Sequence, residues 1–245
     1  MGMDLRHPAL LAIVGPTAVG KTQLAVELCQ RFSGEVINAD SRQVYRQMDI
    51  GTAKPTPEER AQAPHHLLDL LDPSEHFGLG AFLPLAQAAT SDISARGKLP
   101  IVAGGTGQYL WALLEGQSVP PVPPDPEFRA ALEQEAAEEG GAQILHDRLR
   151  EIDPARADAL DPRNVRRVVR ALEIYHATNK KPSELVQSSP DISAHLVIGL
   201  TMERKALYRR IDSRVDAMMQ AGFLAEVERL AEAGYPMGEG ALDSP

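Results

Sequence analysis

The sequence predicts an α/β fold, in which a parallel sheet is flanked by helices and carries a small all-helical insertion domain. Short apolar runs alternate with helical patterns along the first part of the chain. A glycine-rich turn follows the first apolar run directly, and a proline-rich segment precedes a wholly helical pattern over residues 126–177. Alternation of strand and helix is typical of parallel sheets covered by helices.

The first strand is expected at residues 10–14, a continuous apolar run of the kind found in strands buried on both faces. The glycine-rich turn comes next. A helix is then predicted over residues 21–32, with Leu24, Leu28 and Phe32 on one face.

Two further strands are expected at residues 35–40 and 99–103. Between them, Thr56 begins a capping box and Pro57 occupies the first helical position, which predicts a helix start. A second helix is predicted over residues 80–96. The order strand, helix, strand, helix, strand supports the parallel sheet.

A stiff connector is expected at residues 119–126, because its prolines remove backbone donors and fix φ. The chain therefore divides into a first core part at residues 1–118, a helical insertion domain at 119–190 and a return to the core at 191–245. The returning part is predicted to hold a strand at residues 195–200 and helices at 204–221 and 225–233.

Composition supports a sizeable core and restricts the partners. The chain has 245 residues, of which 43% are hydrophobic, and a formal net charge of −9. That net charge argues against indiscriminate nucleic-acid binding. Residues 148–214, however, contain 14 Lys and Arg against 9 Asp and Glu. Any contact with a polyanion is therefore expected to be local to that stretch.

The single cysteine, Cys29, excludes an intramolecular disulfide and fits a reducing cytosol. The apolar run at residues 9–14 is too short for a signal peptide or a membrane span. The sequence therefore predicts a cytoplasmic protein without a membrane segment.

The glycine-rich turn is a phosphate-binding P-loop, which makes the predicted fold P-loop NTPase-like. Its glycines let backbone N–H groups face phosphates, Lys21 supplies charge, and the Thr22 hydroxyl can ligate Mg²⁺. The expected diphosphate-binding residues are Gly15, Pro16, Thr17, Ala18, Val19, Gly20, Lys21 and Thr22.

Two loops at other strand ends are expected at the same edge of the sheet, where ligands bind. Asp40 is a candidate general base or metal ligand, and the alternative is a turn cap formed with Ser41. Gly104, Gly105 and Thr106 stand where a motor-type ATPase would carry an acidic residue. This favours a site in which a second substrate approaches the backbone closely.

Arginines define a basic face in the insertion domain. Their spacing places them on one helix face, opposite Val165, Val168, Val169 and Leu172. The arginines are Arg163, Arg166, Arg167 and Arg170. The face suits an RNA or phosphate contact, and the alternative is a solvated charged face.

Two weaker features remain open. Arg204, Arg209, Arg210 and Arg214 can reach a diphosphate or line a solvated face. The adjacent histidines 65 and 66 suggest metal only weakly, because neighbours on a strand point apart.

Six segments occur in the order found in the tRNA dimethylallyltransferases, the tRNA isopentenyltransferase family, which the chain closely resembles. They are GPTAVGKT at 15–22, NADSRQVY at 38–45, DIGTAKP at 49–55, PHHL at 64–67, GGTGQY at 104–109 and RVVRALE at 167–173. The resemblance implies transfer of a dimethylallyl group from dimethylallyl diphosphate to N6 of the adenosine at tRNA position 37.

The resemblance also implies the residue roles. Asp40 accepts the N6 proton, while Thr17, Lys21 and Arg214 act on the leaving diphosphate with Mg²⁺ on Thr22. The adenosine must leave its stack to react. The implied contacts with the tRNA anticodon stem-loop are Asp40, Ser41, Arg42, Gln43, Thr106, Arg166, Arg167, Val168, Val169 and Arg170. The expected state is a monomer. Family members usually continue beyond the position of Pro245, so a truncated C-terminus is expected.

Three other functions stay open. A P-loop small-molecule kinase would bind ATP through the same motif. An adenylate isopentenyltransferase would prenylate a free nucleotide, although the arginine-bearing insertion favours a macromolecular acceptor. A non-catalytic RNA-binding module is disfavoured by the joint presence of Lys21, Thr22 and Asp40.

Overall fold

The chain forms two compact units in a computed structural model that describes residues 10–120, 122–185, 195–236, 238 and 240–242. The first unit combines residues 1–116 with 190–245, and the second contains residues 117–189. The expected domain boundary at residue 190 lies outside the described residues.

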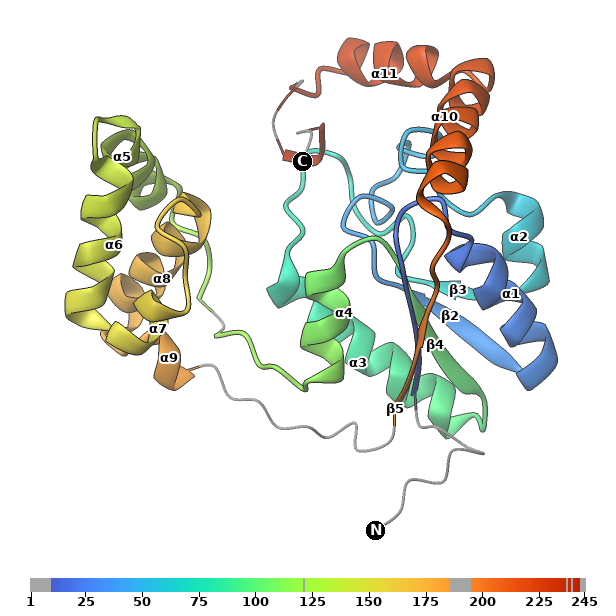
Figure 1. Ribbon diagram of the computed structural model, residues 1–245, viewed down its shortest axis with the longest axis horizontal. Coiled ribbons are helices and arrows are strands. Elements are labelled where there is room, and N and C mark those ends of the chain that lie inside the picture. Colours follow the sequence, from blue (N-terminus) through green and yellow to red (C-terminus); the bar gives the residue numbers. More distant parts are fainter. Residues whose placement is uncertain (1–9, 121, 186–194, 237, 239, 243–245) are drawn as a thin grey trace. The chain divides into compact units, whose positions relative to one another are not determined.

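A five-stranded parallel sheet forms the centre of the first unit (Figure 1), which confirms the predicted fold class. The strand order is β3-β2-β4-β1-β5. The strands are β1 (Leu10–Val14), β2 (Gly34–Asn38), β3 (His65–His66), β4 (Leu99–Ala103) and β5 (His195–Gly199). Sequence patterning did not predict β3, because two residues are too short to show a period.

The strand order places the site. Strands β2, β4 and β1 are neighbours, with Asn38 in register with Ala103 and Ile13 with Ala103. Because all three run in the same direction, the loops that follow them meet at one edge of the sheet.

The helices of the first unit lie close to their predicted bounds, except that the helix at Gly107–Leu114 was not predicted. They are α1 (Lys21–Phe32), α2 (Pro57–Gln62), α3 (Leu79–Ala95), α4 (Gly107–Leu114), α10 (Arg204–Gln220) and α11 (Phe223–Glu232), with a short 3₁₀ turn, η1, at Gly240–Leu242. The capping box of α2 is present as predicted. The predicted face of α1 was partly wrong, since Phe32 is exposed and the buried positions are Ala25, Val26 and Cys29.

The second unit is all-helical, as expected for the insertion. Its helices are α5 (Pro126–Ala137), α6 (Gly141–Ile152), α7 (Pro154–Asp158), α8 (Val165–Thr178) and α9 (Pro182–Leu185). Leu145, Leu149, Val168 and Leu172 belong to its apolar core. Within the described part of the chain, no helix has the length and apolarity needed to cross a bilayer.

Candidate functional site

Three loops enclose a cavity of about 90 Å³ at the carboxyl edge of the sheet. They follow β1, β2 and β4, and α10 contributes one arginine. The lining residues are Thr17, Ala18, Lys21, Thr22, Ala25, Val36, Asn38, Asp40, Gln43, Thr52, Pro55, His65, Ala103, Gly104, Gly105 and Arg214. The cavity thus joins the P-loop to Asp40, as the sequence predicted.

The Lys21 ammonium is held at the P-loop by two hydrogen bonds. Its Nζ donates to the carbonyls of Gly15 at 3.0 Å and Pro16 at 2.9 Å. An ammonium has three hydrogens, so one remains for an anion. Burial lowers the pKa of Lys21, the Asp40 carboxylate opposes that shift, and the Arg214 guanidinium adds to it. A bound anion would relieve the clustering of these two cations.

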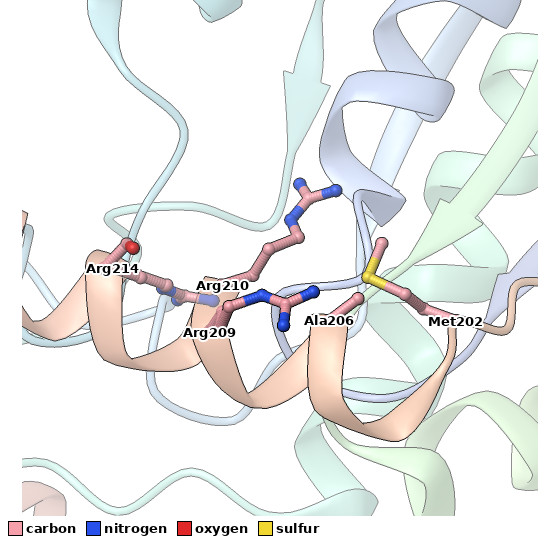
Figure 2. Close-up of a pocket in the computed structure, with 6 residues that line it drawn as sticks. Met202, Ala206, Arg209, Arg210 and Arg214 are labelled. Carbon is pink, nitrogen blue, oxygen red and sulfur yellow. The ribbon is translucent and has the colours of Figure 1, made fainter.

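The α10 arginines form the second cationic element. An open groove of about 550 Å³ runs along α10 and is lined by Met202, Ala206, Arg209, Arg210, Ser213 and Arg214. Figure 2 shows the labelled arginines projecting from one side of the helix. A nitrogen of Arg210 lies 3.9 Å from where a Cβ of Gly20 would be, directly beside the P-loop. Arg204 is different, because it donates to the Tyr208 hydroxyl.

Asp40 caps the turn after β2 with one carboxylate oxygen and leaves the other toward the cavity. Its Oδ1 accepts hydrogen bonds from the N–H groups of Arg42 at 2.9 Å and Gln43 at 3.4 Å, so it caps the turn after β2. Its Oδ2 lies toward Gly105, 2.7 Å from where a Cβ would stand. One carboxylate oxygen therefore fixes the side chain, and the other has no hydrogen-bond donor among the described residues.

The glycines after β4 allow the backbone to pack closely against the segment that follows β2. A Cβ on Gly104 would lie 2.2 Å from the carbonyl oxygen of Ala39, and one on Gly105 would meet Asp40. These glycines therefore pack closely against the end of β2, and both also line the cavity. Thr106 Oγ1 accepts from Ser41 N at 2.9 Å and donates to Ser41 Oγ at 3.1 Å, which ties the two loops together.

The residues after β2 that were expected to contact RNA therefore fall into two groups. Asp40 and Gln43 line the cavity. Ser41 is bonded to Thr106, and Arg42 donates from Nη1 to the carbonyl of Ala241 at 2.9 Å. The cavity side chains remain available for a substrate, whereas the other two already have contacts within the protein.

The paired histidines hold the fold. His65 Nδ1 bonds the Ala63 carbonyl at 2.8 Å, and His66 Nε2 contacts buried Glu35 at 2.7 Å. In the described ranges there is no group of three His, Cys, Asp or Glu side chains that could bind a metal. The weak metal suggestion at residues 65 and 66 therefore has no structural support.

The basic face of the insertion is narrower than its spacing suggested. Helix α8 begins at Val165, so Arg163 precedes it and pairs with Asp161 at 2.6 Å. Arg170 is ion-paired with buried Glu173 and donates to the Val122 carbonyl at 2.8 Å. Arg163 and Arg170 are thus engaged within the unit.

Arg166 and Arg167 are exposed and carry no ion pair among the described residues. Val168 and Val169 are buried in the core of the unit, as their position opposite the arginines predicted. Their apolar packing instead fixes the helix that displays the two arginines.

Lys54 and Glu226 were missed as supports of the site. Both are buried charged residues that hold the loop over residues 48–54. Lys54 stands in a loop with few other charges, which is a weak signal in the sequence. Glu226 has no local signal, because its partners lie more than 170 positions earlier.

Comparison with known families identifies the group to which this architecture belongs. A family model described as IPP transferase matches residues 43–244, and one described as isopentenyl transferase matches residues 8–69. The chain belongs to the IPP transferase family. The resemblance found in the motifs is thereby confirmed.

Individual members of the IPP transferase family are similar over most of the chain. A tRNA dimethylallyltransferase of Roseiflexus sp. (strain RS-1) is 58% identical over 226 residues, which are 92% of this chain and 74% of that protein. The tRNA dimethylallyltransferase of Thermomicrobium roseum is 53% identical over 234 residues, covering 96% of this chain and 70% of its own length.

Solved structures of two such transferases are also similar to this chain. The tRNA isopentenylpyrophosphate transferase of Bacillus halodurans is 46% identical with a TM-score of 0.62, covering 92% of this chain and 71% of that one. A eukaryotic dimethylallyltransferase acting on tRNA is 36% identical with a TM-score of 0.75, covering 91% of this chain and 56% of that one.

Proposed function

We propose that the protein transfers a dimethylallyl group from dimethylallyl diphosphate to N6 of the adenosine at tRNA position 37 and releases diphosphate. The observation that carries the proposal is a single cavity that joins the P-loop to the Asp40 carboxylate. Relatives named tRNA dimethylallyltransferase at above half identity support it. The strand end at Gly104, which lacks an acidic residue, speaks against a hydrolytic motor.

The leaving group is the diphosphate. As the C1–O bond of the allyl donor breaks, negative charge grows on the diphosphate and cationic character on C1. Lys21, Arg214 and the backbone N–H groups of the P-loop face this charge, and the Thr17 hydroxyl can donate near the scissile bond. Donors already in place where charge develops lower the barrier, because they need little reorganisation during the reaction.

The acceptor is the exocyclic amine of adenine. As the N6–C1 bond forms, nitrogen becomes cationic and one of its two hydrogens becomes acidic. Asp40 takes that proton, so the product keeps one hydrogen on N6. A carboxylate of ordinary basicity suffices because the proton leaves as the new bond forms.

Mg²⁺ fits the oxygen donors of the cavity. Mg²⁺ is commonly held by one or two protein oxygens together with substrate phosphates, and the Thr22 hydroxyl is such a donor beside the P-loop. When bound, it would neutralise charge on the diphosphate. The Thr22 side chain would hold it at the start of α1.

The tRNA contacts proposed in the insertion are Arg166 and Arg167, whose exposed guanidiniums suit phosphate groups. Arg170 contributes by holding α8 to the Val122 carbonyl of the connector. We further propose that the protein acts as a monomer in the cytoplasm, where its tRNA substrate is found.

The deciding experiment incubates the protein with labelled dimethylallyl diphosphate, Mg²⁺ and unmodified tRNA, followed by digestion to nucleosides. Label is expected in N6-dimethylallyladenosine. Asp40→Ala should lower transfer by at least about 100-fold, the usual scale for loss of a general base. The control is Asp216→Asn, an exposed carboxylate on α10. Wild-type turnover in Asp40→Ala would remove Asp40 as the base.

Ligand preference separates this function from its alternatives. Dimethylallyl diphosphate with Mg²⁺ is expected to raise the unfolding temperature more than ATP with Mg²⁺. Stabilisation by ATP alone, with phosphate transfer to a small molecule, would replace the proposal by a kinase. Prenylation of free adenylate in preference to tRNA would indicate the nucleotide-modifying activity.

A further inference from the structure

The amide of Gln43 has a fixed orientation. Its Nε2 donates to the carbonyls of Thr52 at 3.0 Å and Ala53 at 3.1 Å. Both amide hydrogens are therefore used. The amide cannot be flipped, because Oε1 would then face two carbonyl oxygens, which donate no hydrogen. Gln43 also lines the cavity that contains Asp40. What the side chain can still offer to a ligand is the acceptor Oε1 alone.

Asn38 repeats this arrangement at the end of β2. Its Nδ2 donates to the Leu67 carbonyl at 3.0 Å and to the Asp40 carbonyl at 3.5 Å. Three of the polar side chains that line the cavity from β2 and its following loop thus offer oxygens as acceptors: Asn38, Asp40 and Gln43. The P-loop side supplies Lys21 and, from α10, Arg214. The cavity therefore has a cationic side and an acceptor side.

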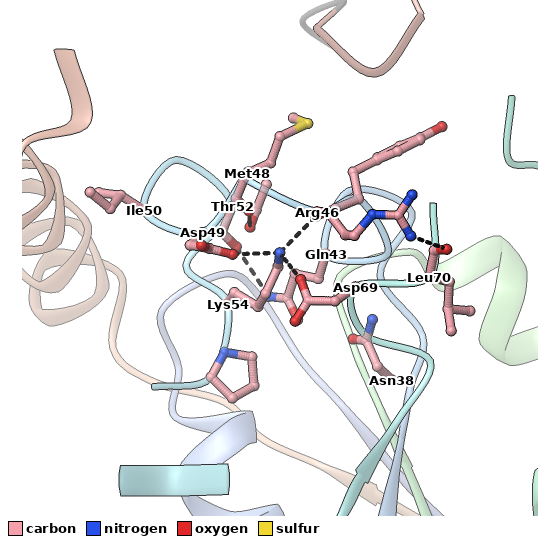
Figure 3. A network of polar contacts seen from close by, with 12 residues as sticks. Asn38, Gln43, Arg46, Met48, Asp49, Ile50, Thr52, Lys54, Asp69 and Leu70 are labelled. Carbon is pink, nitrogen blue, oxygen red and sulfur yellow. Dashed lines mark hydrogen bonds and ion pairs between the residues drawn. The ribbon is translucent and has the colours of Figure 1, made fainter. Parts of the chain in front are cut away.

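The carbonyls that hold Gln43 are themselves held on two sides. Lys54 Nζ donates to the Tyr45 carbonyl, Asp49 Oδ1 and Asp69 Oδ1, each at 2.6 Å (Figure 3). From α11, the Glu226 carboxylate accepts three consecutive backbone N–H groups, those of residues 49, 50 and 51, at 2.8 to 2.9 Å. Buried charges therefore hold the loop that carries Thr52 and Ala53 from two sides, and rotation of the Gln43 amide would lose two hydrogen bonds.

We infer that Gln43 Oε1 is a specificity-determining acceptor for the second hydrogen of the N6 amine. The inference rests on the proposed function. Of the two N6 hydrogens, one passes to Asp40 as the C–N bond forms, and the other stays on nitrogen and is the one that Gln43 holds. An exocyclic amine supplies both donors. A base with a 6-oxo group presents an acceptor to this side of the cavity and leaves Gln43 without a partner.

The physical basis for discrimination is the cost of an unpaired polar group. Sites built to hydrogen-bond a donor reject analogues that lack it, because the buried partner is left unsatisfied. Gln43 acts on the base and not on the diphosphate. Its loss should therefore reduce use of the RNA while leaving the affinity for the allyl donor unchanged.

The test compares wild type with Gln43→Met, which keeps the length of the side chain and removes its polar atoms. At saturating dimethylallyl diphosphate, kcat/KM for an anticodon stem-loop is expected to fall about 10- to 100-fold. The KM for dimethylallyl diphosphate should stay within about twofold of wild type, since a lost hydrogen bond on the far side does not touch the diphosphate. Gln62→Met on α2, an exposed position, is the control.

A second measurement separates recognition from support of the loop. Stem-loops with adenosine or inosine at the acceptor position compete against labelled substrate. Wild type should prefer adenosine, and Gln43→Met should reduce that preference about tenfold.

The inference is overturned if Gln43→Met keeps the full preference for adenosine. It is equally overturned if the variant weakens diphosphate and RNA alike, since that result means general loss of the cavity. Failure of the wild-type protein to prenylate the stem-loop in the same assay would instead reject the proposed function.

Discussion

Replacing Lys54 by Met removes the charge that joins three backbone segments and puts an unbranched apolar side chain in its place. The Lys54 side chain is 1% exposed and donates three hydrogen bonds. The Asp49 carboxylate is 61% exposed, so its ion pair contributes only about 0–1 kcal/mol. The Tyr45 carbonyl and the Asp69 carboxylate lose a charged donor, and such hydrogen bonds contribute about 1.5–3 kcal/mol each.

Since Met recovers part of the loss through apolar packing, the net expectation is about 3 kcal/mol lower free energy of unfolding. For a protein of this size that corresponds to a Tm lower by about 6–12 °C, measured by thermal unfolding followed by circular dichroism. Lys205→Met, at an exposed lysine on α10, should change Tm by less than about 2 °C. A shift equally small in Lys54→Met would refute the view that this lysine supports the loop.

Four more predictions concern the site and the insertion. Gly105→Ala should lower prenyl transfer with little change in Tm, because the new Cβ would stand 2.7 Å from Asp40 Oδ2; unchanged rates would show that the carboxylate can move without cost. Arg167→Ala should weaken tRNA binding and reduce its salt slope by about one without altering stability. Arg170→Ala should lower Tm, because Glu173 stays buried with one fewer cation; the reverse pattern for the two arginines would contradict their assignment. Burial raises the pKa of Glu173, but hydrogen bonds from Arg129, the Asp125 N–H and Arg170 outweigh it and lower that pKa to about 2. A carboxyl group whose pKa is lower in the folded than in the unfolded state stabilises the fold above its unfolded-state pKa, and this stability is lost as pH falls. Wild type should therefore lose stability between about pH 5 and 2. Glu173→Gln should show a flatter profile in acid denaturation.

Strands β1, β2, β4 and β5 could be predicted because each contains an apolar run, whereas β3 consists of two histidines and shows no pattern. The P-loop and Asp40 were predictable for a related reason. A parallel sheet brings the carboxyl ends of its strands to one edge, so motifs after successive strands must meet there. The edge of the sheet at which these motifs meet could therefore be predicted from their position in the chain alone.

The side-chain partners were not predictable. Arginine spacing on a helix cannot reveal that Arg170 is engaged by Glu173 and the Val122 carbonyl, because the connector reaches it only through tertiary structure. Glycines after β4 suggested room for a ligand, whereas Gly104 is required by contact with Ala39. Spacing gives the direction in which a residue points, and the fold decides what it meets.

The carboxylate of Glu226 has a consequence for how the chain can be shortened. It accepts the N–H groups of residues 49, 50 and 51 from a position 175 to 177 residues later in the chain. A fragment ending at residue 222 would retain the P-loop, Asp40, Gln43 and the arginines of α8 and α10. It would nevertheless lose the buried anion that completes those three donors, and with it the rigidity of the wall opposite the P-loop. The part of the chain that supports the site is thus longer than its motifs indicate, and α11 belongs to it.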